Sequence, residues 1–135
     1  VVLPPGNTAS TQAYTLVKRL AHNFGKRQFR LLLNRIESPE QAQAVARNFA
    51  HTAEQYLGVS VDYLGYIPLD ERLTRAGHLR TSVVEAFPVA QSTSQFRKLA
   101  DGLLRWPQPP SLGSVGGFMQ RVIQGGRLVE AYRRG

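Results

Sequence analysis

The chain has 135 residues, 42% of them hydrophobic and 19% charged, which suits one globular domain with a core of its own. It contains no cysteine, which excludes a disulfide framework, a zinc ribbon and a thiol nucleophile. No apolar run approaches the roughly 20 residues of a membrane-spanning helix. Seventeen Lys and Arg against nine Asp and Glu give a net charge of +8. That excess favours an anionic partner such as nucleic acid, phospholipid or nucleotide, without choosing among them.

Three segments have the composition of β-strands. Residues 1–3 form the first, which runs into Pro4-Pro5-Gly6. Residues 29–36, Phe-Arg-Leu-Leu-Leu-Asn-Arg-Ile, form the second, and three consecutive leucines predict a strand buried on both faces of a parallel sheet. Residues 59–67 form the third, which Pro68 ends because proline cannot extend a ladder of hydrogen bonds.

Two helices are predicted between these strands. The first has Asn7, Thr8 or Ser10 as its cap and Gly25 as its end, with an apolar face at spacings of three and four residues. That face consists of Ala13, Leu16, Val17, Leu20 and Phe24. The second helix begins with the capping-box pattern of Ser38 and Gln41 and ends at Gly58. Its predicted stripe consists of Ala42, Val45, Ala46, Phe49, Ala53 and Tyr56.

After the third strand we expect a short helix over residues 70–77, an extended piece at Val83-Val84 and a helix over residues 90–105. The alternation of strands and helices predicts an α/β fold with three layers, namely a mostly parallel sheet with flanking helices and right-handed crossovers. This domain spans residues 1–105. Residues 106–116 read as a linker rich in Pro, Gly and Ser, and residues 117–135 as an amphipathic C-terminal tail.

The carboxyl ends of the predicted strands gather distinctive residues on one rim of the sheet, where α/β proteins bind ligands. Asn34 offers an amide that donates and accepts, and Arg35 a planar cation that stacks on a base, so the pair suits a purine. The alternative is that Asn34 satisfies loop backbone and Arg35 is a solvated charge. Asp70 and Glu71 resemble paired carboxylates, but acidic residues in a first helical turn are the simpler interpretation.

The C-terminal tail has the pattern of an interfacial amphipathic helix. Phe118, Met119, Val122 and Ile123 fall within one apolar arc at 100° per residue, as in helices that bind anionic lipid surfaces. The alternative is a helix docked on the domain's own core or on a partner. No glycine-rich loop followed by Lys-Ser or Lys-Thr occurs, so the chain has no phosphate-binding loop of that kind.

Three stretches, in this order, resemble the C-terminal half of MinD/ParA-type P-loop ATPases, most closely the flagellar-number regulators of the FlhG/FleN group. They are residues 8–18 (Thr-Ala-Ser-Thr-Gln-Ala-Tyr-Thr-Leu-Val-Lys), residues 31–35 (Leu-Leu-Leu-Asn-Arg) and residues 64–71 (Leu-Gly-Tyr-Ile-Pro-Leu-Asp-Glu). Ala9 and Gln12 depart from the serine and aspartate usual in the family, which puts in question any dimer contact of those groups.

The resemblance implies ATP or ADP as the ligand, with adenine surrounded by Asn34, Arg35, Ile67, Pro68 and Asp70. It places the phosphate loop, the Mg²⁺ ligands and the catalytic aspartates in an N-terminal half that this chain lacks. We therefore expect a fragment that is inactive alone, from a weak ATPase.

For the whole protein, the resemblance implies a cytoplasmic homodimer that binds the inner face of the cell membrane through the tail. Its partner would be a flagellar assembly or regulatory protein. Alternatives are an ATPase for division-site placement or DNA partition, and a non-enzymatic basic module that binds DNA or anionic lipid directly, with DNA the less favoured partner.

Overall fold

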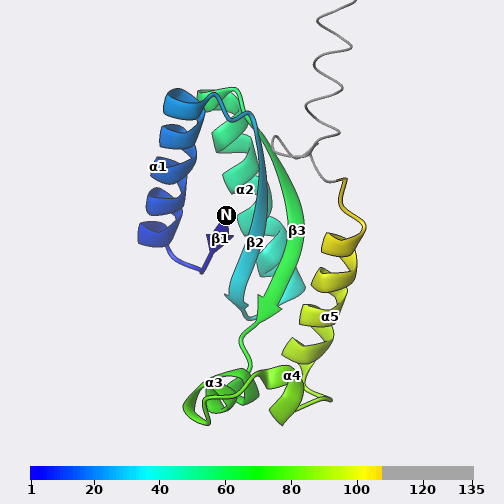
Figure 1. Cartoon of the computed structure of the whole chain (residues 1–135). Coiled ribbons are helices and arrows are strands. Elements are labelled where there is room, and N and C mark those ends of the chain that lie inside the picture. The colour runs from blue at the N-terminus through cyan, green and yellow to red at the C-terminus, as the bar shows by residue number, and fades with distance from the viewer. Residues whose placement is uncertain (108–135) are drawn as a thin grey trace, which may run out of the picture. The chain divides into compact units, whose positions relative to one another are not determined.

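A three-stranded parallel sheet organises residues 1–107, the part of the chain that the computed structural model describes (Figure 1). The strands are β1 (Val2–Leu3), β2 (Gln28–Ile36) and β3 (Ser60–Pro68), in the spatial order β1-β2-β3. Helices α1 (Asn7–Phe24) and α2 (Pro39–Leu57) connect them. Helices α3 (Glu71–His78), α4 (Val83–Ala86) and α5 (Gln91–Leu104) follow β3. The predicted α/β class is confirmed, and the predicted tail lies outside the described residues.

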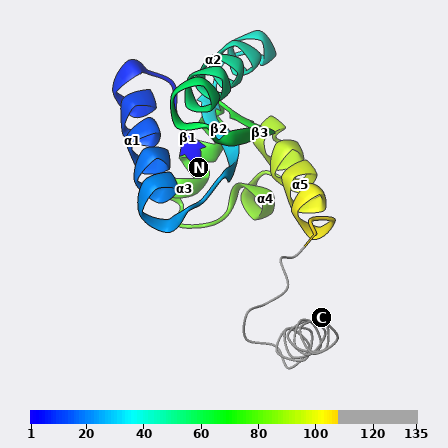
Figure 2. The ribbon, with the colours of Figure 1, turned by 90° about the horizontal axis from the view of Figure 1, so that it is seen from above.

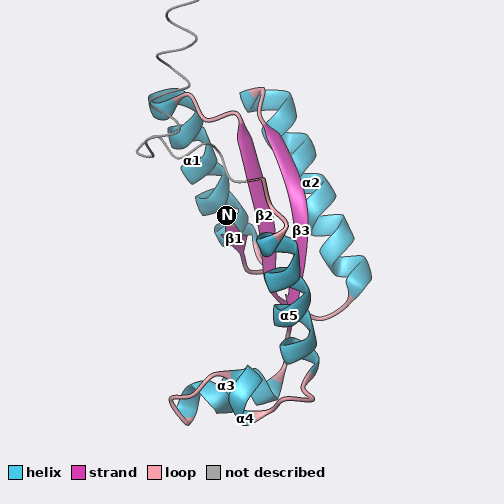
Figure 3. Ribbon diagram, turned by 45° about the vertical axis from the view of Figure 1, so that its right-hand side comes forward, coloured by secondary structure: helices cyan, strands magenta, loops and turns pink. Residues whose placement is uncertain are grey.

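The helices lie on both faces of the sheet. Because the spatial order of the strands follows the chain, two right-handed crossovers place α1 and α2 on the same face (Figure 2). On the other face lies α5: a Cβ atom added to Gly65 of β3 would stand 3.4 Å from Leu99 Cδ2 of α5. Figure 3 shows α2 behind β3 and α5 in front of it. Helices α3 and α4 lie beyond the carboxyl ends of β2 and β3 (Figure 1).

The main core fills the space between the sheet and the helices α1 and α2. Alternate residues of β2, namely Phe29, Leu31 and Leu33, are buried in it, as the pleat of a strand requires. On the other face Leu32 and Asn34 are only half-buried. The prediction that this strand is buried on both faces is therefore right for one face, because α5 packs beside β3 and leaves that side of β2 partly open.

The start and the buried face of α1 differ from the prediction. Gly6 is the N-cap, with φ of 119° and no side-chain capping bond, so the helix already begins at Asn7. The hydroxyl of Ser10 then donates back to the carbonyl of Gly6 within the helix. The buried residues are Ala13 and Val17, as predicted, and Ala21, which was not predicted. Phe24, predicted to be on that face, is 70% exposed.

The predicted cap of α2 by Ser38 is present, and Gln41 reaches back to the residue before the cap rather than to the cap itself. The N–H of Gln41 donates to Ser38 Oγ at 3.1 Å, and Gln41 Oε1 accepts from the N–H of Glu37 at 2.8 Å. Gly25 and Gly58 end α1 and α2 in the left-handed conformation, as predicted. Tyr56, placed on the apolar stripe by its spacing, is 69% exposed, and Leu57 is buried instead.

The predicted extended piece at Val83-Val84 is wrong. These residues form α4, a single helical turn in which the hydroxyl oxygen of Ser82 accepts from the N–H of Glu85 at 3.2 Å. Two β-branched residues indicated a strand, but the cap and the packing of Val83 outweigh that weak propensity. No helix of residues 1–107 is long and apolar enough to cross a membrane.

Candidate functional site

Strands β2 and β3 end side by side, and their carboxyl ends form one wall of a cavity of about 260 Å³. Of the five residues predicted to surround a base, four line it: Asn34, Arg35, Pro68 and Asp70. The fifth residue, Ile67, does not line the cavity. It pairs with Asn34 in the sheet and is 2% exposed, so it is buried beneath the rim. The opposite wall consists of Leu73 and Thr74 of α3.

Arg35 owes its place to a bulge in β2. Asn34 pairs with Ile67 and Ile36 with Pro68, so Arg35 is an extra residue between two neighbouring pairs. Its φ of 59° lies in the left-handed region, which non-glycine residues rarely adopt. Such bulges redirect a side chain. The exposed guanidinium group is therefore placed at the cavity by the backbone rather than by packing.

Asp70 is the N-cap of α3 and is also bound to α5. Its Oδ1 accepts from the N–H of Arg72 at 2.9 Å, which confirms the helix-start interpretation over the paired carboxylates. Its Oδ2 accepts from both the N–H and the hydroxyl of Ser92, at 3.1 and 2.7 Å. Burial raises the pKa of Asp70, but the hydrogen bonds from Ser92 and Arg72 and the charge of Arg72 together bring it below its ordinary value.

Ser92 is the residue of this region that the sequence pattern did not single out. It lies 22 positions after Asp70, in the first turn of α5, and it is fully buried. A serine near a helix start signals a cap, but no local spacing indicates a partner so far away. Leu73 and Thr74 were missed for the same reason, since the fold of α3 against the rim brings them to the cavity.

The sequence was compared with family models and with curated proteins. No family model matches the chain. The chain is 31% identical over 118 residues to the antiactivator FleN of Pseudomonas aeruginosa, and the match covers 87% of the chain. The chain is therefore similar to FleN over most of its own length. This confirms the predicted resemblance to the FlhG/FleN group. The chain spans about 42% of the length of FleN, so the remainder of FleN has no counterpart in these 135 residues.

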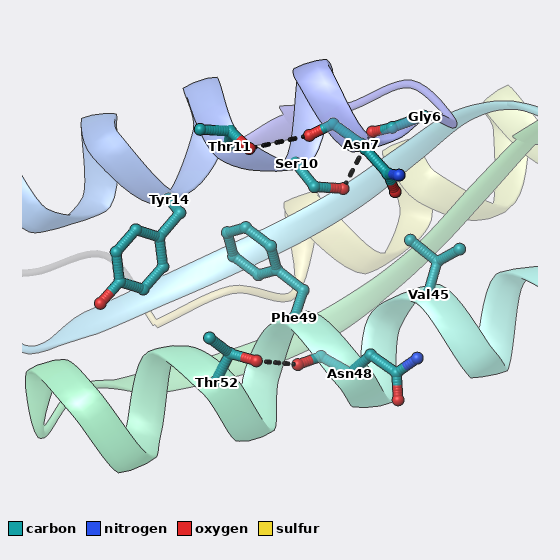
Figure 4. A pocket seen from close by; sticks show the side chains of 9 residues that line it. All are labelled: Gly6, Asn7, Ser10, Thr11, Tyr14, Val45, Asn48, Phe49 and Thr52. Carbon is teal, nitrogen blue, oxygen red and sulfur yellow. Dashed lines mark hydrogen bonds between the residues drawn. The ribbon is translucent and has the colours of Figure 1, made fainter.

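A second groove lies between α1 and α2 (Figure 4). Its volume is about 440 Å³. The hydroxyls of Ser10, Thr11 and Thr52 donate to carbonyls of their own helices, so these protons are not directed into the groove. Tyr14 and Phe49 lie between the two helices at its floor.

A third cavity, of about 570 Å³, lies between α3, α4 and α5. Its walls are mainly apolar and include Leu73, Val83 and Phe96. Both this cavity and the α1–α2 groove are larger than the rim cavity. Of these three cavities among the described residues, the rim alone gathers an amide, a guanidinium and a carboxylate that can orient a ligand. Among residues 1–107 no group of three or more His, Asp or Glu side chains can hold a metal ion.

Proposed function

We propose that this chain forms the adenine-binding side of a nucleotide-dependent regulator of flagellar number or placement, within the MinD/ParA family. The observation that carries the proposal is the shared cavity of Asn34, Arg35, Pro68 and Asp70 at the carboxyl ends of β2 and β3. The relationship to FleN supports the same assignment. In parallel sheets this edge is the usual place for ligands.

The chemistry of the rim suits a purine base. The Asn34 amide can donate to and accept from the Watson–Crick edge of adenine, and the Arg35 guanidinium can stack on its face. A cavity of about 260 Å³ is smaller than the roughly 300–1,000 Å³ of complete small-molecule pockets. It therefore suits the base of ATP or ADP, with the phosphates and Mg²⁺ held by residues outside this chain.

The whole protein, on this proposal, is a homodimeric weak ATPase that restrains a flagellar assembly or regulatory protein. The name antiactivator, which FleN carries, supports such a restraining role. We further propose that the protein lies at the inner face of the cytoplasmic membrane, attached through Phe118, Met119, Val122 and Ile123. A net charge of +8 supports attraction to the anionic lipid surface.

Isothermal titration with ADP and GDP tests the base-binding role. The protein to be used is the longer one that contains residues 1–135 together with a phosphate loop. Asn34→Ala is expected to weaken ADP binding about 3- to 10-fold, the effect of losing one or two hydrogen bonds, and to reduce the preference for ADP over GDP. Asn48→Ala removes an exposed amide of the α1–α2 groove and is the matched control. Unchanged ADP affinity in both Asn34→Ala and Arg35→Ala would contradict the proposal.

A further inference from the structure

We propose that Asp70 is a positioning residue that links the base-binding rim to α5 through Ser92. The contact between these two side chains is called the Asp70–Ser92 clasp below. This inference rests on the proposed function of the rim. It assigns Asp70 a role other than contact with the nucleotide, and it gives α5 a part in binding.

Both carboxylate oxygens of Asp70 are already engaged within the chain. Oδ1 accepts from the N–H of Arg72 at 2.9 Å, and Oδ2 accepts two bonds from Ser92 at 3.1 and 2.7 Å. The backbone carbonyl of Asp70 accepts from the N–H groups of Leu73 and Thr74, two residues of the cavity wall. One residue thus caps α3, fixes a wall of the cavity and holds α5.

The first turn of α5 depends on this attachment because its polar residues are buried. Ser92 and Thr93 are both 0% exposed. The hydroxyl of Thr93 lies 3.1 Å from the carbonyl oxygen of Val83 and 2.8 Å from that of Phe87, and donates to both. Loss of the Asp70 carboxylate would leave the Ser92 hydroxyl and N–H buried without their acceptor, and loss of the Ser92 hydroxyl would remove one of the two bonds. Both changes disfavour the docked helix.

The physical consequence is thermodynamic linkage. A base that binds the rim stabilises the conformation in which Leu69 to Thr74 form its wall, and that conformation includes the Asp70–Ser92 clasp. Ordering of α5 and binding of the base therefore favour each other, and the coupling is equal in both directions. In the sequence α5 precedes the linker and the predicted membrane-binding tail. Nucleotide binding would therefore order the helix that leads into this tail.

Amide hydrogen exchange at Ser92 and ADP titration together test the linkage, in the longer protein that binds nucleotide. The variants are Ser92→Ala, Asp70→Asn and the double variant, with Ser94→Ala as the control at an exposed serine of the same helix. We expect Ser92→Ala to weaken ADP binding about 3- to 10-fold. The double variant should bind ADP with the same affinity as Asp70→Asn alone, because both substitutions remove the same contact. In the unaltered protein ADP should slow exchange in the first turn of α5, and in Ser92→Ala it should not.

The possible results separate the two proposals. If Asp70→Asn weakens ADP binding but Ser92→Ala does not, Asp70 contacts the nucleotide directly and the positioning role is overturned. If exchange in α5 is as slow in Ser92→Ala as in the unaltered protein, the clasp does not hold α5, even where Asn34→Ala weakens ADP binding. If Asn34→Ala leaves ADP affinity unchanged while Ser92→Ala speeds exchange in α5, the proposed base site is wrong. The linkage between that site and α5 is then wrong as well. Ser92→Ala keeps the carboxylate and the α3 cap, so it tests the clasp even if Asp70→Asn does not fold.

Discussion

At the scale of single residues, the backbone of Arg35 is the least ordinary feature of the rim. Its φ of 59° costs a non-glycine residue about 1–2 kcal/mol, whereas glycine adopts it freely. A residue kept in such a conformation at a cavity is a reason to expect that its side chain is needed there. The strain and the function of Arg35 can therefore be separated by substitution.

Arg35→Gly is expected to raise the free energy of unfolding by about 0.5–1 kcal/mol, because the gain from relieving strain exceeds the entropy that glycine adds to the unfolded chain. The same substitution should weaken ADP binding, because the guanidinium is lost. Arg35→Ala loses the guanidinium but keeps the strained backbone, so only its nucleotide affinity should change. Urea unfolding followed by circular dichroism gives the stabilities. A glycine variant no more stable than the alanine variant would show that the bulge is unstrained.

Single residues were predictable from the sequence where a local rule determined them. Asn34 and Arg35 stand at the end of an apolar run, and their arrival at one rim with Pro68 and Asp70 follows from parallel strands alone. Ser92 was not predictable, because its contact with Asp70 depends on the path of α3 and α4 between them. Whether the rim residues bind a base remains a prediction.

At the scale of elements, periodicity located α1 and α2 and much of the face that each helix buries, but it misplaced the residues near the C-terminal end of each helix. Leu31 of β2 is 0% exposed, whereas Phe24 at the end of α1 is 70% exposed although its spacing matches the apolar face. Ala13 and Val17 are buried as predicted, and Ala21, which was not predicted, is buried with them.

This difference gives a direct comparison of two large-to-small substitutions. Leu31→Ala should lower the free energy of unfolding by about 2–5 kcal/mol, because it leaves a cavity in the main core. Phe24→Ala removes a larger side chain and should change stability by no more than about 0.5 kcal/mol, because that side chain is mostly in solvent. Chemical denaturation of both variants measures the difference. Comparable losses would mean that Phe24 packs into the core in solution.

At the scale of the whole molecule, the predicted tail is the part with the most direct test. Phe118→Glu places a charge in the apolar arc and should abolish most binding to vesicles of anionic lipid in a flotation assay. The reason is that the glutamate carboxylate would have to lose its bound water to enter the apolar part of the membrane. Gln120→Glu, outside the arc, makes the same change of charge and is the control. If the two variants float alike, charge rather than apolar insertion governs binding, and an unaffected Phe118→Glu excludes the insertion model.

The division of the apolar side chains into two clusters has a consequence for how the chain comes apart. Among residues 1–107, fourteen buried apolar side chains form the core under the sheet, whereas the cluster of α3 to α5 has only three fully buried ones, Ala76, Val83 and Ala90. Less apolar surface is removed from water in the smaller cluster, so it opens at a lower free energy than the sheet unfolds. We therefore expect residues 71–104 to open before the sheet unfolds, and a protease to find its first cleavage sites there while β2 and β3 remain paired.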